Sequence, residues 1–329
     1  MQARRILLIA SGLVLASLEV RAEAFRLQLP LACEPGRTCF VQHHVDHDPG
    51  PEARDYAGGP RTYDRHDGTD FRLTSGVAAA SPLGRVRAAA AGTVLRIRND
   101  APDVSVRESG IASVEGVECG NGLVVAHPDG YETQYCHLAR GSLRVRPGEA
   151  VAAGQEIGQV GLSGASEFPH LHFTVRRAGR ILDPFAPEGP GTGAGDSLWD
   201  EALRGPLAYQ AGTILNAGFS DGPVSMAAVE AETTGTAGAQ ADALVAWVRV
   251  IGLDTGDVQS LVVRTPDGRV LSAGRQPPLA KPRAQSLMFV GKKRPAGGWP
   301  AGTYVATFSL LRAGRSVAEH SFSVRLPPP

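Results

Sequence analysis

Short runs of alternating apolar and polar residues, separated by turns that contain glycine or proline, fill most of this sequence. The chain has 40 glycines and 24 prolines among 329 residues, which leaves few uninterrupted stretches that could form long helices. Alternation is typical of strands, whose successive side chains point to opposite faces. Leu123–His127 and Tyr131–His137 flank the turn Pro128-Asp129-Gly130 and predict a hairpin. We therefore predict an all-β chain with antiparallel sheets.

The length suggests two domains, because one domain commonly takes about 100–200 residues. The stretch PEGPGTGAG at 187–195 is typical of a linker, and strand-like runs continue beyond it. We predict a first domain over 25–188, a linker over 189–214 and a small immunoglobulin-like β-sandwich over 215–329. Between Asn99 and Glu118, a polar stretch predicts an insertion that shapes a binding surface at one end of the sheet.

The first 24 residues have the pattern of a signal peptide. Arg4 and Arg5 precede the apolar run Ile6–Leu18, and Ala22-Glu23-Ala24 supplies small residues for cleavage after Ala24. The apolar run is shorter than the roughly 20 residues that span a bilayer, and no later run is longer. We expect a periplasmic or secreted protein without a membrane span; an uncleaved N-terminal anchor is the alternative.

The charge balance limits the classes of partner that the chain can bind, and the cysteine content indicates its cellular compartment. Lysine plus arginine and aspartate plus glutamate both number 33, so the balance disfavours a nucleic-acid partner. The four cysteines predict two disulfides in an oxidising compartment, Cys33–Cys39 and Cys119–Cys136. A cysteine metal site is the competing interpretation, but the sequence has no Cys-x-x-Cys pair.

Three histidine groups have arrangements that a metal site needs. His66 and Asp70 lie four residues apart around Gly68, and His170-Leu171-His172 would place two imidazoles on one face of a strand. Imidazole and carboxylate suit Zn²⁺, and a catalytic zinc keeps three protein ligands. His66, Asp70 and one histidine of the His-x-His pair would supply them. Bound zinc would lower the pKa of water from 15.7 to roughly 7.

The remaining histidine of that pair and His137 would then be available for proton transfer and oxyanion stabilisation. Each group also has a simpler interpretation when it is taken alone. His66 and Asp70 could form a surface pair, and an exposed strand tolerates His170 and His172. The metal-site hypothesis depends on all the groups lying in one small β-unit.

Several motifs together resemble peptidase family M23, the LytM or lysostaphin-type zinc endopeptidases of peptidoglycan. The resemblance covers about residues 63–185, a little over a third of the chain. It is carried by His66-Asp67-Gly68-Thr69-Asp70, Gly120-Asn121-Gly122, Tyr135-Cys136-His137-Leu138, Val151-Ala152-Ala153-Gly154-Gln155-Glu156-Ile157-Gly158, His170-Leu171-His172-Phe173 and Asp183-Pro184.

The resemblance implies roles for five side chains. His66, Asp70 and His172 would be the Zn²⁺ ligands. His137 and His170 would orient the attacking water, take its proton and stabilise the tetrahedral intermediate, and which of the two is the base stays open. The implied fold is an antiparallel β-sheet with a groove that holds the metal, and the implied partners are stem or cross-bridge peptides of peptidoglycan.

One departure from the family pattern concerns the groove. Ser166-Glu167-Phe168-Pro169 places an aromatic ring where the family commonly has glycine, so we expect Phe168 to reshape the wall beside the substrate. Asp64 and Asp67 are expected to be solvated turn residues, with a contact to a ligand imidazole as the alternative.

Other histidines and the tryptophans are predicted to have no catalytic part. The segment HHVDHD, with His43, His44 and His47, is expected to form an exposed loop. His127 and His320 receive no role. The tryptophans are expected to pack in cores rather than to stack sugars; they are Trp199, Trp247 and Trp299.

The leading functional hypothesis is an exported zinc endopeptidase that cleaves peptidoglycan cross-links. The alternative is a catalytically inactive regulator or activator of other cell-wall hydrolases, which retention of all five motif residues disfavours. A lipoyl-type carrier would need a lysine in the first domain, whereas Lys281, Lys292 and Lys293 all fall in the second. The second domain could hold the enzyme on the wall, bind a protein partner or shield the groove.

Overall fold

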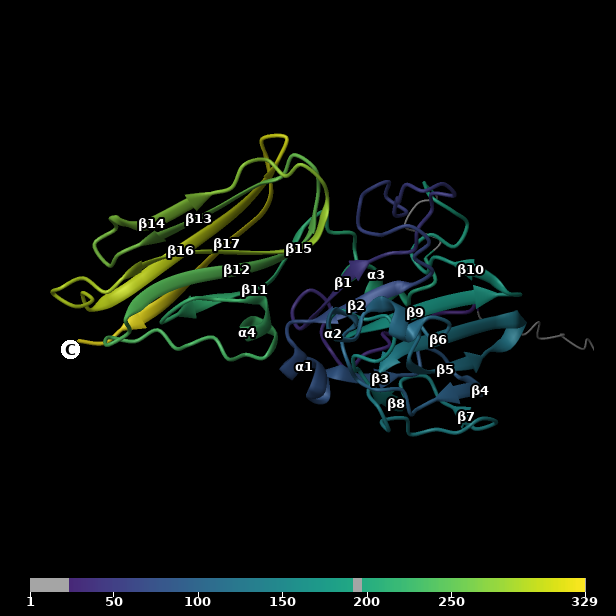
Figure 1. Cartoon of the computed structure of the whole chain (residues 1–329). Coiled ribbons are helices and arrows are strands. Elements are labelled where there is room, and N and C mark those ends of the chain that lie inside the picture. Colours follow the sequence, from purple (N-terminus) through teal and green to yellow (C-terminus); the bar gives the residue numbers. More distant parts are fainter. Residues whose placement is uncertain (1–23, 192–196, 329) are drawn as a thin grey trace, which may run out of the picture.

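The computed structural model describes residues 24–191 and 197–328. The predicted signal peptide, residues 1–24, lies almost wholly outside these ranges. Within them, no helix has the length and apolar character that a bilayer span requires. The chain forms two β-rich bodies that lie end to end, and Figure 1 shows α4 (Met226–Glu230) of the second body beside α1 (Gly76–Ala80) of the first.

The first body is built on an antiparallel sheet of eight strands with the order β1-β2-β9-β6-β5-β4-β7, and β10 pairs with β9. A separate pair is formed by β3 and β8. The strands are β1 (Cys39–His43), β2 (Thr69–Leu73), β3 (Arg85–Arg87), β4 (Gly92–Arg98), β5 (Asn121–Ala126), β6 (Tyr131–Leu138), β7 (Ala150–Val151), β8 (Glu156–Gln159), β9 (His170–Arg177) and β10 (Arg180–Leu182).

The helices of the described residues are all short, as the glycine and proline content predicts. Serine is the N-cap residue of several of these helices. The Ser75 hydroxyl accepts a hydrogen bond from the Ala78 amide, and the Ser105 hydroxyl accepts one from the Arg107 amide. Besides α1 and α4, the helical segments are η1 (Pro82–Gly84), α2 (Val106–Ser109), η2 (Ile111–Val114), η3 (Pro128–Gly130) and α3 (Glu201–Arg204). Both α2 and η2 lie in the predicted insertion.

The predicted hairpin is confirmed. β5 pairs with β6 in antiparallel register, with Val125 opposite Thr133. The turn between them has Asp129 and Gly130 at φ values of 58° and 74°, a region that glycine and aspartate tolerate better than most residues.

Alternation gives the large sheet one apolar and one polar face. Phe71 of β2 and Leu171 and Phe173 of β9 enter the first core, where the Trp199 ring contacts Phe71. The neighbours of these residues along each strand therefore point to the opposite face. In the register Asp70 pairs with His172, so both of these side chains lie on the polar face.

Core packing also includes residues from the predicted linker. Leu198, Trp199 and Leu207 are buried in the first core although they fall within 189–214. Trp247 and Trp299 are likewise buried in the second body. The three tryptophans are packing residues, as expected, while the domain boundaries stay a prediction.

The second body is a β-sandwich, as predicted, and its immunoglobulin-like character stays a prediction. Sheets of order β11-β12-β15 and β14-β13-β16-β17 share one core, to which Val248, Leu261 and Phe308 contribute. The strands are β11 (Thr213–Ser220), β12 (Ala243–Leu253), β13 (Val258–Arg264), β14 (Val270–Arg275), β15 (Arg283–Lys293), β16 (Gly302–Arg312) and β17 (Arg315–Leu326).

Both predicted disulfides are present, Cys33–Cys39 and Cys119–Cys136. The second ties the segment before β5 to β6. Cys136 lies opposite His172 in the register, so this covalent link is made beside the polar face of the sheet.

Candidate metal centre

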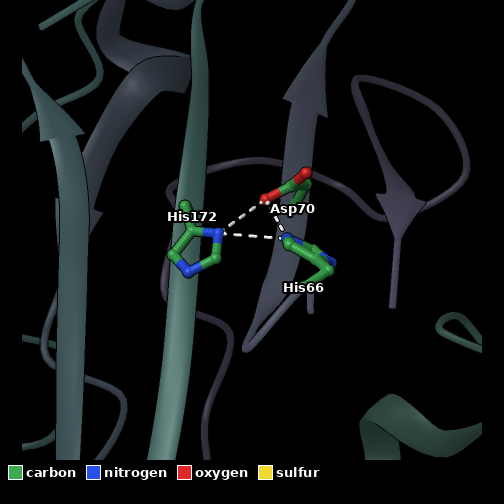
Figure 2. A group of neighbouring side chains, drawn as sticks. All are labelled: His66, Asp70 and His172. Atoms are coloured by element: carbon green, nitrogen blue, oxygen red, sulfur yellow. Dashed lines mark hydrogen bonds and ion pairs between the residues drawn. The ribbon is translucent and has the colours of Figure 1, made fainter. Parts of the chain in front are cut away.

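The structure brings the three candidate metal ligands together. Asp70 comes from β2, His172 from the neighbouring β9, and His66 from the loop before β2, as Figure 2 shows. The His66 Nε2 atom lies 3.1 Å from Asp70 Oδ1 and 3.1 Å from His172 Nδ1, and the last two atoms are 3.0 Å apart. Ligands around one tetrahedral zinc at about 2.1 Å are separated by roughly 3.4 Å, so these donor atoms have the spacing of a shared ion.

Gly68 permits this approach of the loop to the sheet. A Cβ atom at this position would lie 2.7 Å from His172 Nε2 and 2.8 Å from the carbonyl oxygen of Phe173. Real side chains do not tolerate such contacts, which explains why the turn between His66 and Asp70 contains glycine.

In each of the two candidate histidine ligands, a hydrogen bond on the far side of the ring orients the donor nitrogen. His66 donates from Nδ1 to the His44 carbonyl at 2.6 Å, which leaves the Nε2 lone pair available. His172 uses Nε2 toward Asp67 Oδ1 at 3.0 Å, which leaves Nδ1. Outer contacts of this kind fix the tautomer and orientation of metal-binding histidines.

The prediction of an exposed HHVDHD loop is wrong. His43 and His44 are 8% and 2% exposed. His43 donates from Nδ1 to Asp70 Oδ2 at 2.9 Å, while the His44 ring packs against Phe185. His47 contacts Asp183 at 2.9 Å.

The cause of this error is the pairing of β1 with β2, which sets His43 opposite Asp70 after an irregularity at Val41–His43. His43 is thus a residue of the site that sequence reasoning missed. The short apolar run that precedes it, Cys39-Phe40-Val41, was a strand signal that could have shown it as part of the sheet.

The two aspartates beside the first motif have different surroundings. Asp67 contacts His172 and also accepts a hydrogen bond from Arg176 at 3.0 Å, so the alternative of a contact to a ligand imidazole holds for it. Asp64 is half-exposed, and its ion-pair partner is the neighbouring Arg65 at 3.9 Å. It is a surface turn residue, as expected.

The electrostatics of the site favour an ionised Asp70. Burial raises the pKa of its carboxyl, but His66, His170, His172 and His43 outweigh burial and hold that pKa well below its usual value. Burial lowers the pKa of His172, whereas Asp67 and Asp70 overcome this and raise it to about 9. His172 is therefore protonated near pH 7 in the absence of a metal, and a cation that binds its Nδ1 atom takes the place of that proton beside the two carboxylates.

His137 and His170 lie beside the three donor atoms. Their pKa values are lowered, whereas the pKa of His172 is raised. Their ring centroids are 4.7 Å apart. Burial, together with His170 and His172, holds the pKa of His137 well below its usual value, and burial lowers the pKa of His170 to about 4. Both imidazoles are therefore neutral near pH 7, with one unprotonated nitrogen each.

Backbone carbonyls orient both rings. His137 donates from Nδ1 to the Ser163 carbonyl at 2.8 Å, and His170 donates from Nδ1 to the Phe168 carbonyl at 2.8 Å. The Nε2 atom of each ring then carries the lone pair, and that of His170 lies 3.5 Å from Asp70 Oδ1. His137 has a φ of 62°, a conformation that non-glycine residues adopt mainly where surrounding structure or function demands it.

Two cavities adjoin the five side chains. A polar compartment of about 220 Å³ is lined by Asp67, Glu118, Gln134, Arg176 and Tyr63 together with His137 and His172. A second cavity, which we call the apolar compartment, has about 520 Å³ and adjoins Asp70 and His170. Its apolar lining includes Phe168 and two residues of the predicted insertion, Val106 and Ile111. Phe168 and the insertion thus form walls of this cavity, while the binding of substrate against them stays a prediction.

Comparison with known proteins identifies the part of the chain that carries the site. Residues 64–184 match the model of peptidase family M23. The chain is 37% identical over 71 residues to the cell division protein DipM of Caulobacter vibrioides, covering 22% of this chain and 11% of that protein. It is 31% identical over 125 residues to the peptidoglycan DD-endopeptidase ShyB of Vibrio cholerae, covering 38% of this chain and 24% of that protein.

Among solved structures, a zinc-containing peptidase from Vibrio cholerae is similar, with 28% identity and a TM-score of 0.28 over 45% of this chain and 39% of that one. The chain spans less than a third of the length of the curated relatives it matches.

Proposed function

Residues 64–184 belong to peptidase family M23, and on this premise we propose that the chain is an exported zinc endopeptidase. Its proposed reaction is hydrolysis of peptide cross-links in peptidoglycan by a metal-activated water. The proposed partners are the stem or cross-bridge peptides of the wall. The relative ShyB, a peptidoglycan DD-endopeptidase by name, supports this substrate class.

The observation that carries the proposal is the convergence of three donor atoms from His66, Asp70 and His172 within 4.8 Å of one another. Two imidazole nitrogens and one carboxylate oxygen are a donor set that suits Zn²⁺. Zinc bound there would supply a Lewis acid for the peptide carbonyl and would lower the pKa of water to roughly 7.

His137 and His170 supply the proton transfers in this proposal. Since both rings are neutral near pH 7 and present Nε2 beside the donor atoms, either can take the proton of the attacking water. The protonated ring can then donate a hydrogen bond to the tetrahedral intermediate or return the proton to the leaving amine.

Export to the periplasm or the exterior is part of the proposal. The pattern of Arg4, Arg5 and the apolar run before Ala24 is typical of a signal peptide. The two disulfides also favour an oxidising compartment.

The test is digestion of purified Gram-negative sacculi by the full chain, with released muropeptides analysed by mass spectrometry. We expect cross-linked dimers to fall and monomers to rise, activity to stop with a chelator, and Zn²⁺ to restore it. An Asp70→Asn variant is the matched control. Unchanged muropeptides with zinc bound would contradict the endopeptidase and favour the inactive regulator.

A further inference from the structure

The polar face of the sheet continues past the metal centre to the second body. Arg72 lies two residues from Asp70 on β2 and pairs with His170 across the sheet, so its side chain shares the face of the site. Arg72 binds the Glu230 carboxylate and donates to Gln285 Oε1 at 3.1 Å, both in the second body. The strand that carries Asp70 therefore also holds the second body.

A second arginine, Arg249, contacts the same carboxylate from within the second body. We call the contacts of Arg72 and Arg249 with Glu230 the junction. Arg249 of β12 also binds the Glu230 carboxylate, and it donates to the Thr74 carbonyl of the first body. Asn216 donates to the same carbonyl at 2.8 Å. Arg72 and Arg249 are 1% and 0% exposed in their side chains. Two buried arginines share one carboxylate across the boundary between the bodies. This contact favours a single relative position of the two bodies, because moving the bodies apart would leave buried charges unpaired.

This arrangement sets the start of β15 over the groove. Pro282, Arg283 and Ala284 line the apolar compartment together with Asp70 and His170. The cavity volume of about 520 Å³ falls in the range of about 300–1,000 Å³ that is common for ligand sites. The second body thus supplies one wall of a compartment that opens directly on the metal centre.

Arg283 brings an unneutralised positive charge to this wall. Its side chain is exposed, and among the described residues no carboxylate or carbonyl oxygen binds it. Glu167, which also lines the compartment, already forms a two-point contact with Arg107 at 3.1 and 2.7 Å. The guanidinium of Arg283 is therefore available to an anionic ligand.

We propose that the second domain completes the substrate groove, with Arg283 binding a carboxylate of the substrate peptide and Pro282 and Ala284 packing against its small apolar side chains. The substrate peptide is the occupant because the compartment is continuous with the metal centre and carries a positive charge at its edge. Stem peptides of peptidoglycan combine alanine with free carboxylates, so this inference rests on the proposed function and deepens it.

The test measures equilibrium binding of a cross-linked muropeptide dimer, released from Gram-negative sacculi by muramidase, to the zinc-loaded full chain. His137→Ala is used as the parent to prevent turnover. Adding Arg283→Ala should weaken binding about fivefold or more, and Arg283→Lys should retain most of it. Lys292→Ala is the matched control, since Lys292 is an exposed cation on the same strand about 30 Å away.

A second pair of variants tests the apolar wall. Ala284→Trp should fill the compartment and weaken binding, whereas Ala273→Trp, on exposed β14 surface, should not. Thermal unfolding of each variant checks that the fold is kept. Equal affinities for Arg283→Ala and Lys292→Ala, or no binding of the dimer by the parent, would overturn the inference. Binding that depends on Arg283 without hydrolysis by the wild-type chain would keep the inference and refute the proposed reaction.

Discussion

His43 donates a hydrogen bond from Nδ1 to Oδ2 of Asp70 at 2.9 Å, on the carboxylate oxygen opposite the one that faces His66 and His172. This contact holds the carboxylate in the orientation that directs Oδ1 toward the other donor atoms. It also satisfies the oxygen that would otherwise be buried without a partner.

Removing this contact should weaken metal binding without removing a proposed ligand. We expect His43→Ala to lower zinc affinity by about 10–100-fold, the usual effect of losing a partner of a metal ligand. Competition with a chromogenic chelator measures the affinity directly. His320→Ala, at an exposed position of the second body, is the control, and equal affinities for the two variants would refute a positioning role for His43.

Substitutions of the proposed metal ligands and of the proposed proton-transfer pair should have different effects on bound zinc. Asp70→Ala and His172→Ala should lose nearly all bound zinc, because two donor atoms do not hold the ion as three do. His137→Ala and His170→Ala should keep zinc and lose about 10²–10⁴-fold in turnover. Elemental analysis and muropeptide release give the two readouts. The role assignment fails if all four variants lose zinc equally.

Much of the site could be predicted because its signals are local. The His-x-His spacing follows from strand geometry, and the glycine between His66 and Asp70 reports a close approach that the structure contains. The hairpin was likewise encoded in a short turn sequence. What these motifs share is that each one fits within a single strand or turn.

The features that sequence reasoning missed depend on pairing between distant segments. His43 reaches Asp70 only through the register of β1 with β2, and a polar run of residues such as HHVDHD does not show burial on its own. The junction joins Arg72 to Glu230 across 158 positions. No local pattern encodes such partners, because the fold as a whole decides which buried charges meet.

The junction should contribute measurably to stability. Glu230→Gln would leave Arg72 and Arg249 buried around a neutral amide, so we expect a loss of about 2–3 kcal/mol in the free energy of unfolding. Urea unfolding followed by tryptophan fluorescence measures this. Glu319→Gln on exposed β17 is the control; a similar small change in both variants would show that the junction adds little.

His127 should make stability depend on pH at a place away from the metal centre. It donates from Nδ1 to the Ala91 carbonyl at 2.7 Å, and its Nε2 contacts the Thr133 hydroxyl at 2.8 Å. Burial lowers the pKa of His127, and the contacts with Ala91 and Glu132 offset this only in part. The folded state therefore takes up a proton at this ring less readily than the unfolded chain, whose pKa is about 6.5.

Since the unfolded state binds more protons as the pH falls below about 6.5, the stability that His127 contributes is full above that pH and declines below it. His127→Asn keeps a donor for Ala91 and cannot titrate. The free energy of unfolding of the wild-type chain should exceed that of this variant at pH 7.5. We expect this difference to shrink as the pH falls toward the lowered pKa that His127 has in the folded state, as measured by urea unfolding at each pH. A difference in unfolding free energy that stays constant or grows as the pH falls would contradict the assignment of a neutral, buried His127.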